Sequence, residues 1–302
     1  LWIEKYRPQK FDEIMGQSKI INILEKMIEN GSFPHLILSG ISGTGKTSTI
    51  NAIINKLYGN NKTFMIMKLD ASDDRGISAV REEIKGFAEK ISLFNQGIKL
   101  IVLDEADSMT FDAQFALRRI IEKYSDTTRF CLVCNYENKI INPIKSRCLN
   151  FRFIPLNNEN IVTKLNHICE KENINTKQKT LKVIAGLSNG DFRKSINLLQ
   201  SVSMSNSNIT TSLCYETVGL LKTQIVKKIF NILLDPSLDF ICKSNKINKY
   251  LINTGISLSL FLGQLTKILL DYTTDIDNNK ISKYLVELAN LEYMVSNSTF
   301  GK

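Results

Sequence analysis

A glycine-rich run, GISGTGKT at residues 40–47, limits the folds open to this chain. It matches the phosphate-binding pattern G-x-x-x-x-G-K-[ST]. The apolar run at 35–39 predicts a buried strand that enters the loop, and the segment at 47–57 predicts a helix that leaves it. Glycines let the backbone turn tightly, so that N–H groups converge on phosphate oxygens at the helix N-terminus. The chain is therefore expected to contain an α/β domain with a nucleotide site.

Two side chains of this loop have expected roles. Lys46 would reach the β- and γ-phosphates of ATP, and the Thr47 hydroxyl would bind Mg²⁺. The other residues of the loop would surround the phosphates, largely through their backbone. They are Gly40, Ile41, Ser42, Gly43, Thr44, Gly45 and Ser48.

A second motif, IKLIVLDEAD at 98–107, supplies acidic groups. Its apolar part predicts a strand buried on both faces, with Asp104 at the carboxyl end, where open α/β sheets bind ligands. Asp104 would complete the Mg²⁺ site, and Glu105 would polarise a water for attack on the γ-phosphate. Alone, these acids would fit a solvated loop equally well. Together with the glycine-rich loop they predict ATP hydrolysis.

Composition restricts the partners. The chain of 302 residues has no apolar run long enough to span a bilayer, so no membrane segment is expected. The net charge of +9 is spread along the chain without a basic tail, and alone it favours DNA binding only weakly. Cys131 and Cys134 have the spacing of half a zinc site, but no second pair follows, so reduced core thiols are expected instead.

Strand and helix patterns alternate in the first half of the chain, which favours a mainly parallel sheet with helices on both faces. The predicted strands are 36–39, 64–69, 98–103, 130–134 and 149–153, and the predicted helices are 18–30, 46–57, 78–92 and 111–124. After Pro155 only helical patterns appear, near 158–172, 177–187 and 191–204 and, beyond a polar linker, to about 297.

Four further motifs lie outside the two phosphate motifs. They are WIEKYRP (2–8), DASDDRGI (70–77), QFALRR (114–119) and SRC (146–148). In this combination the chain resembles the small subunits of replication factor C, the eukaryotic clamp loader among the AAA+ ATPases. The segments FCLVCNYENKI and SRCLNFRF are most similar to the subunit type numbered 3 in yeast and 5 in humans. The resemblance is dense over residues 1–204.

The resemblance implies an α/β P-loop AAA+ module with a helical lid, followed by an all-α C-terminal collar. On this basis residues 1–154 are the nucleotide-binding domain, 155–208 the lid and 209–302 the collar through which the chain oligomerises. The implied function is ATP-driven loading of the sliding clamp, proliferating cell nuclear antigen, onto primer–template DNA in replication and repair. The implied partners are the other subunits of a hetero-pentamer, the clamp and the DNA backbone. The implied location is the nucleus, and no membrane partner is expected.

The resemblance also implies site residues that spacing alone does not identify. Asn135 would contact the γ-phosphate or the attacking water as sensor 1, and Arg193 of the lid would reach the nucleotide as sensor 2. Without the resemblance, a capping Asn and a solvated helix Arg remain open, and WIEKYRP would be an ordinary loop. Residues that would pack around the adenine and ribose are Ile3, Tyr6, Arg7, Pro8, Met15 and Gly16.

The arginine of the SRC motif, Arg147, would act on another chain. The resemblance implies that it enters the ATP site of the adjacent subunit as an arginine finger, where a planar and permanently charged donor suits the developing phosphoryl charge. The alternative is a salt bridge at the rim of the domain. If the finger role holds, the isolated chain should be a poor ATPase.

The resemblance also implies DNA contacts, which would be sequence-independent and directed at phosphates. The candidates are Arg75, Ile77, Arg81 and Lys85, with Thr110 and Gln114 behind them. For Arg81 and Lys85 a merely solvated helix face remains open.

Two other functions of the chain also remain open. One is a nucleotide-binding structural subunit with little hydrolysis. The other is an AAA+ protein-remodelling ATPase, which would be expected to have an aromatic pore loop where this chain has DASDDRGI.

Overall fold

The chain folds as two compact units. The computed structural model describes residues 1–59, 62–72, 77–90, 97–205, 208–271 and 278–297. One unit comprises residues 1–174 and 181–200, and the other comprises 175–180 and 201–302. The division into three domains at 154 and 208 stays a prediction.

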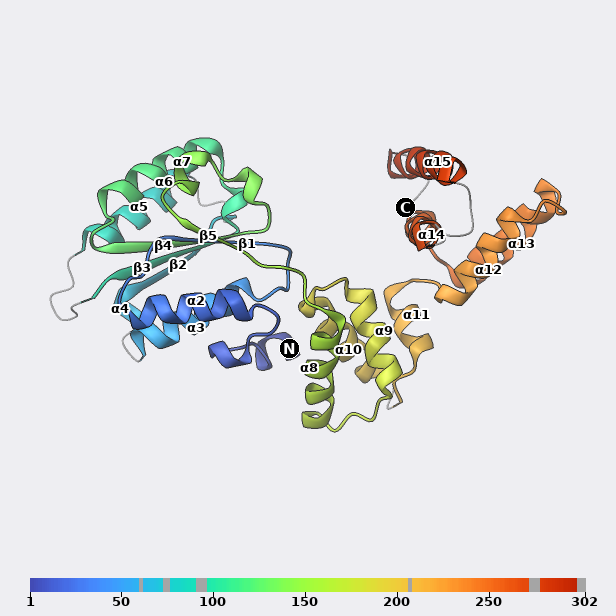
Figure 1. The fold of residues 1–302 in the computed structure, drawn as a ribbon, viewed down its shortest axis with the longest axis horizontal. Helices are drawn as coiled ribbons and strands as arrows, with labels where there is room; N and C mark the ends of the chain where they lie inside the picture. Colours follow the sequence, from blue (N-terminus) through green and yellow to red (C-terminus); the bar gives the residue numbers. More distant parts are fainter. Residues whose placement is uncertain (60–61, 73–76, 91–96, 206–207, 272–277, 298–302) are drawn as a thin grey trace. The chain divides into compact units, whose positions relative to one another are not determined.

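The first unit is built on a five-stranded sheet in the order β2-β3-β4-β1-β5, in which every neighbouring pair is parallel (Figure 1). The sequence predicts each strand to within two residues at either end. The strands are β1 (Leu36–Ser39), β2 (Ile66–Asp70), β3 (Lys99–Asp104), β4 (Thr128–Cys134) and β5 (Leu149–Arg152).

Helices cover both faces of this sheet (Figure 1). Successive side chains of a strand point to opposite faces, so Leu36 and Leu38 enter one core and Ile37 enters the other. The first core is closed by α2 (Ser18–Glu29) and α3 (Lys46–Tyr58). The second is closed by α5 (Ile77–Glu89), α6 (Phe111–Lys123) and α7 (Asn142–Lys145). The predicted parallel sheet with helices on both faces is confirmed.

Three helices follow the sheet: α8 (Asn158–Lys171), α9 (Gln178–Ser188) and α10 (Phe192–Ser205). A sharp turn separates the last two, with Gly190 at φ +82°. A Cβ at Gly190 would lie 2.7 Å from the Cβ of Pro155, so glycine permits this close approach. The Asp191 carboxylate then accepts hydrogen bonds from the N–H groups of Arg193 and Lys194 and so begins α10.

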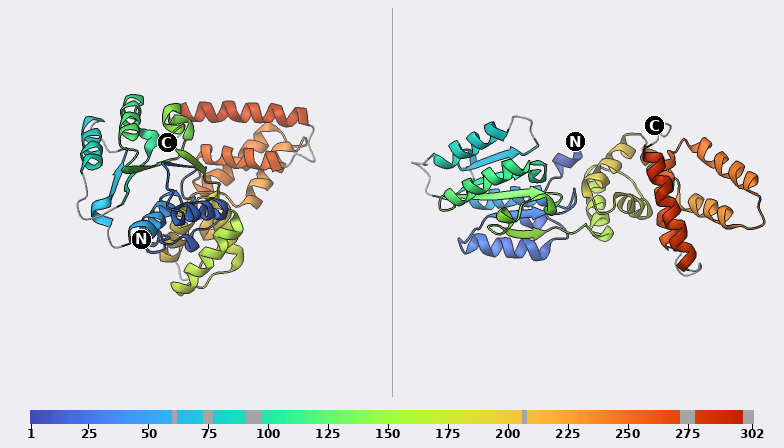
Figure 2. Two further views of the ribbon diagram at one scale, coloured as in Figure 1. Left: turned by 60° about the vertical axis from the view of Figure 1, so that its left-hand side comes forward. Right: turned by 90° about the horizontal axis from the view of Figure 1, so that it is seen from above.

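The described residues of the second unit form helices and their connecting loops (Figure 2), apart from an isolated bridge between Thr176 and Ile209. Val226 and Ile229 of α12 pack with Phe261 and Leu265 of α14 in one apolar cluster. None of the described helices is long and apolar enough to cross a membrane. Its helices are α11 (Thr211–Val218), α12 (Thr223–Leu234), α13 (Phe240–Thr254), α14 (Leu258–Asp271) and α15 (Asn278–Asn297).

Two short elements differ from expectation. The N-terminal segment, a loop by its residues alone, contains the helix α1 (Trp2–Lys5), and the strand expected from 64 begins only after the helix α4 (Lys62–Met65). A four-residue helix is too short to be stable by itself, so tertiary contacts must hold it. The described residues of this unit also include three 3₁₀ turns: η1 (Phe11–Glu13), η2 (Ala106–Ser108) and η3 (Glu137–Lys139).

The first glycine of the phosphate loop should tolerate no side chain. Gly40 has φ +144°, and a Cβ there would lie 2.4 Å from the carbonyl oxygen of Phe153. We expect Gly40→Ala to lower the free energy of unfolding by about 2–4 kcal/mol in urea titration, through strain and overpacking. Gly86→Ala is the control, because a Cβ there meets no atom of another element within 4 Å and alanine favours a helix. Equal losses in the two variants would contradict the steric argument.

Candidate ATP site

The site forms where three neighbouring strands end. β3 pairs with β4 and β4 with β1, all parallel, so their carboxyl ends meet at one edge of the sheet. The glycine-rich loop follows β1, Asp104 ends β3, and Asn135 follows β4. The topology thereby brings the glycine-rich loop close to Asp104, 57 residues beyond Thr47, and to Asn135, 89 residues beyond Lys46.

Lys46, the first residue of α3, links the loop to the end of β4. Its Nζ donates to the carbonyl oxygens of Gly40 at 2.6 Å and Ile41 at 2.9 Å, and to Asn135 Oδ1 at 3.1 Å. Only 7% of this lysine is exposed. Burial lowers its pKa, and the nearby charge of Arg193 lowers the pKa further. A cation held in this way, short of water, is suited to binding phosphate.

Thr47 and Asp104 lie side by side, as their predicted shared role requires. The Thr47 hydroxyl donates to Asp104 Oδ2 at 3.2 Å. A hydroxyl and a carboxylate are oxygen ligands of the kind that Mg²⁺ prefers, and Mg²⁺ commonly takes its remaining ligands from phosphates and water. Among the described residues no three His, Cys, Asp or Glu side chains cluster to hold a metal, and both Cys131 and Cys134 are buried in β4.

Glu105 has a backbone conformation that is unusual for its type. Its φ of 52° and ψ of 37° are left-handed, and its N–H donates to Asp104 Oδ1 at 3.0 Å. For a residue with a side chain this conformation costs on the order of 1–2 kcal/mol, and such strain gathers at functional sites. The conformation turns the chain directly after β3 and leaves Glu105 exposed at the pocket.

Asp107 positions Asn135, a role that the sequence reasoning missed. Its Oδ1 accepts from the backbone N–H of Asn135 at 3.3 Å, and its Oδ2 accepts from that of Tyr136 at 3.1 Å. The last acid of the DEAD run therefore holds the turn after β4. The only available sequence signal was an acid three residues beyond Asp104, and it does not identify Asn135 as the partner, because Asn135 lies 28 residues away.

One pocket brings most of the predicted nucleotide residues together. The expected members that line it are Ile3, Tyr6, Arg7, Pro8, Met15, the loop residues 42–48, Asp104, Glu105, Asn135 and Arg193. Gly16, Gly40 and Ile41 do not line it: Gly16 approaches Leu156, and the other two present carbonyl oxygens to Lys46. Lining residues that were not predicted include Glu13, Ile14, Val133, Leu156, Lys164, Phe192 and Ile196.

The start of α10 lies directly on the glycine-rich loop. The N–H of Phe192 donates to the carbonyl oxygen of Gly43 at 3.3 Å. A Cβ on Gly43 would come within 1.8 Å of an Asp191 carboxylate oxygen. This glycine is therefore needed for the approach of α10 as well as for the turn of the loop, and the same approach brings Arg193 to the pocket.

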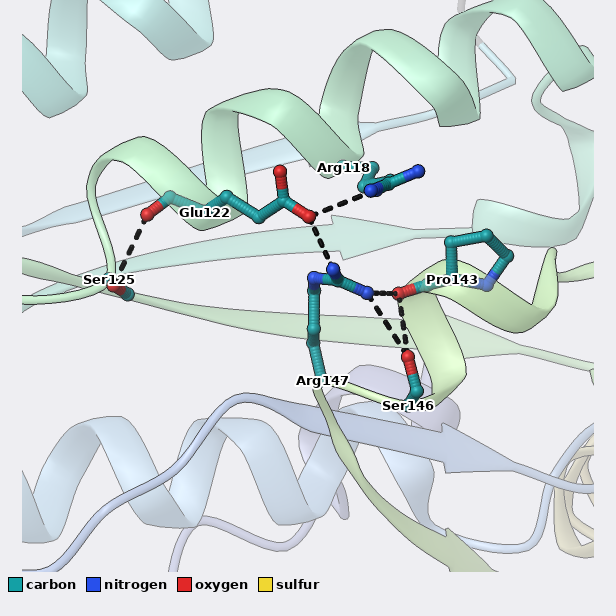
Figure 3. Close-up of polar contacts among 6 residues, drawn as sticks. All are labelled: Arg118, Glu122, Ser125, Pro143, Ser146 and Arg147. Carbon is teal, nitrogen blue, oxygen red and sulfur yellow. Dashed lines mark hydrogen bonds and ion pairs between the residues drawn. The ribbon is translucent and has the colours of Figure 1, made fainter.

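Arg147 does not line this pocket. It lies at the rim of the domain, where its Nη2 pairs with Glu122 Oε1 at 2.5 Å and its Nη1 donates to the carbonyl oxygen of Pro143 at 2.6 Å (Figure 3). Nη1 also donates to Ser146 Oγ at 3.1 Å, and Glu122 pairs with Arg118 as well. Within the single chain Arg147 therefore makes the rim salt bridge that was the alternative interpretation.

The candidate DNA residues are only partly described. Arg75 lies outside the described residues, as do the side chains of Ile77 and Arg81, although both belong to α5. Lys85, on the same helix, is half-buried.

Gln114 cannot support a DNA face with its side chain. Only 1% of this residue is exposed; its amide donates to the carbonyl oxygens of Met109 and Lys139 and accepts from the N–H of Ile141. Its polarity is used inside the domain. Thr110 is exposed and caps α6 through its hydroxyl.

Family models match two segments of the chain. Residues 36–156 match the ATPase family associated with various cellular activities (AAA), and residues 163–204 match the RCF1/5-like AAA+ ATPase lid domain. Among solved structures, the RuvB Holliday junction branch migration motor of Thermotoga maritima covers 86% of this chain and 91% of its own, at a TM-score of 0.58 and 19% identity. That likeness concerns the fold.

Curated relatives match over nearly the whole chain. The probable replication factor C subunit 5 of Dictyostelium discoideum is 44% identical over 98% of this chain and 85% of its own length. Replication factor C subunit 3 of Saccharomyces cerevisiae is 39% identical over 98% of this chain and 87% of its own. Replication factor C subunit 5 of Homo sapiens is 39% identical over 100% and 88%. The expected subunit type, 3 in yeast and 5 in humans, is confirmed.

Removing the Asp107 carboxylate should impair turnover more than nucleotide binding. In Asp107→Ala the N–H groups of Asn135 and Tyr136 lose their acceptors, so the Asn135 side chain is less well placed. We expect roughly a tenfold fall in kcat of the assembled ATPase, with a change in KM for ATP below about threefold. Asp126→Asn, an exposed acid before β4, is the control. An unchanged kcat would show that Asp107 does not position Asn135 for the reaction.

Proposed function

Because the chain belongs to the replication factor C family and carries an AAA ATPase domain, we propose that it is one subunit of a hetero-pentameric clamp loader. In this proposal ATP binding and hydrolysis open and close the sliding clamp, proliferating cell nuclear antigen, around primer–template DNA in the nucleus. The observation that carries the proposal is the joining of two distant motifs at one pocket, through Thr47 with Asp104 and Lys46 with Asn135.

The pocket offers a chemically distinct wall to each part of ATP. Backbone N–H groups of residues 42–48 and the Lys46 ammonium would receive the phosphates at the start of α3. Ile3, Tyr6 and Met15 would contact the adenine and ribose. Arg193 would reach the phosphates from α10, and its positive charge there already acts on the pKa of Lys46.

Mg²⁺ would be held by Thr47 and Asp104 together with phosphate oxygens. When bound, it neutralises charge on the transferred phosphoryl group. Glu105 would orient and polarise the attacking water, because it follows Asp104 directly and borders the pocket. Asn135, held by Asp107, would contact the γ-phosphate or that water.

Glu105→Gln should separate binding from hydrolysis. The amide keeps the size of the side chain but is a poor base, so we expect ATP affinity to stay within about twofold and turnover at this site to fall roughly 100-fold or more. Single-turnover hydrolysis in the assembled loader, with mutations silencing the other sites, measures this loss. Asp126→Asn is again the matched control. Unchanged hydrolysis would favour the alternative of a structural subunit that binds nucleotide without using it.

Arg147 is proposed to act in trans. It lies on the rim of its own domain, outside its own pocket, with its side chain 33% exposed. Surface ion pairs such as that with Glu122 contribute only about 0–1 kcal/mol, so the arginine can exchange this partner for a phosphate of an adjacent subunit.

In the assembly, Arg147→Ala should slow the neighbour's site. We expect a loss on the order of 1,000-fold there, because an arginine finger stabilises charge that develops in the transition state. ATP binding at this chain's own pocket should not change. Arg152→Ala, an exposed arginine on β5, is the control. If hydrolysis at every site were unchanged in Arg147→Ala, Arg147 would not be a finger.

DNA would bind through its phosphates, with Ile77, Arg81 and Lys85 of α5 and Arg75 of the preceding sequence as the proposed contacts. Such binding neutralises phosphates and displaces counterions, so it should weaken steeply with salt and ignore sequence. Residues 209–302 are proposed to form the collar that joins the subunits. The exposed apolar side chains of α15, such as Val286, Tyr293 and Met294, support this role.

A further inference from the structure

Two elements outside the sheet line the candidate ATP pocket. One is the N-terminal segment, residues 2–8, which contributes Ile3, Tyr6 and Arg7. The other is the lid, which contributes Lys164 from α8 and three residues of α10: Phe192, Arg193 and Ile196. These elements are more than 150 residues apart in sequence. Whether they move separately or together decides how nucleotide is held.

The two elements are joined at two points. At the end of α8, Glu172 Oε1 pairs with Lys5 Nζ and accepts from the Tyr6 hydroxyl, both at 2.5 Å. On α10, Gln200 Oε1 accepts from the N–H of Trp2 at 3.1 Å. The first of these points is a charged contact beside a pocket residue. Together the two points also account for the stability of the short helix α1, which lies between them.

We propose that Glu172 is a positioning residue for the nucleotide: it fastens the N-terminal segment to the lid, so that two walls of the pocket act as one body. This inference rests on the proposed ATP site. ATP bound between Tyr6 and Arg193 would then be held by a preassembled pair of walls, without first having to order residues 2–8.

The bond to Tyr6 carries more of this effect than the ion pair. Lys5 is 60% exposed, so its pairing with Glu172 is screened by water and salt. Glu172 is only 19% exposed, and Tyr6 is half-buried and lines the pocket. Hydrogen bonds from Lys5 and Tyr6 lower the pKa of Glu172, so the carboxylate stays charged at neutral pH. A charged acceptor makes a stronger hydrogen bond to the phenol than a neutral one.

Substitution of Glu172 tests the proposal. In the isolated chain we expect Glu172→Ala to raise the Kd for ATP roughly five- to tenfold, which corresponds to the loss of one charge-assisted hydrogen bond. Glu172→Gln, which keeps an acceptor for Tyr6, should raise the Kd less. In the assembled loader KM for ATP should rise while kcat stays within about twofold. Glu170→Ala is the matched control, because Glu170 lies two residues away and its carboxylate accepts only from Asn166 among the hydrogen bonds described.

Trypsin gives a readout of the segment itself. Lys5 and Lys10 are cleavage sites in or next to it, so ATP should protect them in the wild-type chain and in Glu170→Ala but not in Glu172→Ala. Tyr6→Phe should add little to the loss in Glu172→Ala, since both changes remove the same bond. Thermal unfolding of each variant shows whether a loss of ATP affinity comes from misfolding. If Glu172→Ala is misfolded, the Kd of Glu172→Gln for ATP decides the test.

The outcomes separate this inference from the proposed function. If Lys46→Ala abolishes ATP binding while Glu172→Ala and Glu172→Gln bind ATP and resist trypsin like the wild type, the pocket is the ATP site and the role of Glu172 is wrong. If Lys46→Ala binds ATP normally, the proposed site itself is wrong, and the inference is overturned with it.

Discussion

Parallel pairing of β3, β4 and β1 is the constraint on which the rest of the structure depends. It brings three strand ends to one edge, and there the hydrogen bonds of Thr47 to Asp104 and of Lys46 to Asn135 join segments that the chain separates. A parallel sheet needs helical crossovers on its faces, and these helices supply both cores. The positions of the glycine-rich loop, the acidic strand end and Asn135 are therefore products of one topology.

Around that edge, the site is closed by elements without regular pairing to the sheet. The start of α10 lies on Gly43, and the N-terminal segment is tied to the end of α8 by Glu172. Both contacts depend on small local features, a glycine without a side chain and a single carboxylate oxygen. The sheet positions the glycine-rich loop and the acidic strand end, while the surrounding walls depend on a few polar contacts. Regulation of nucleotide affinity is more readily built into such walls than into a buried sheet.

Residues differ in how far their sequence context predicted their place. Lys46, Thr47 and Asp104 line one pocket, as motif spacing and the position of parallel strand ends predicted, and their roles stay predictions. Gln114 was placed behind a DNA face, but it is buried and bonds to the turn before α7, since a polar helix residue looks the same in sequence whether it faces solvent or a backbone carbonyl. The role of Asp107 was missed because its hydrogen-bond partners, Asn135 and Tyr136, follow a different strand.

The sequence by itself determined the fold class, the order of strands and helices, the family and the pair of phosphate motifs, because each is encoded by local periodicity or by residues close together in the chain. Only the tertiary structure decided that Asp107 holds Asn135, that Gly43 admits α10, that Arg147 rests on Glu122, and that Glu172 ties the N-terminal segment to the lid. These contacts join side chains far apart in sequence. Their pairing depends on how packed elements bring single atoms within hydrogen-bond distance, and no local pattern records it.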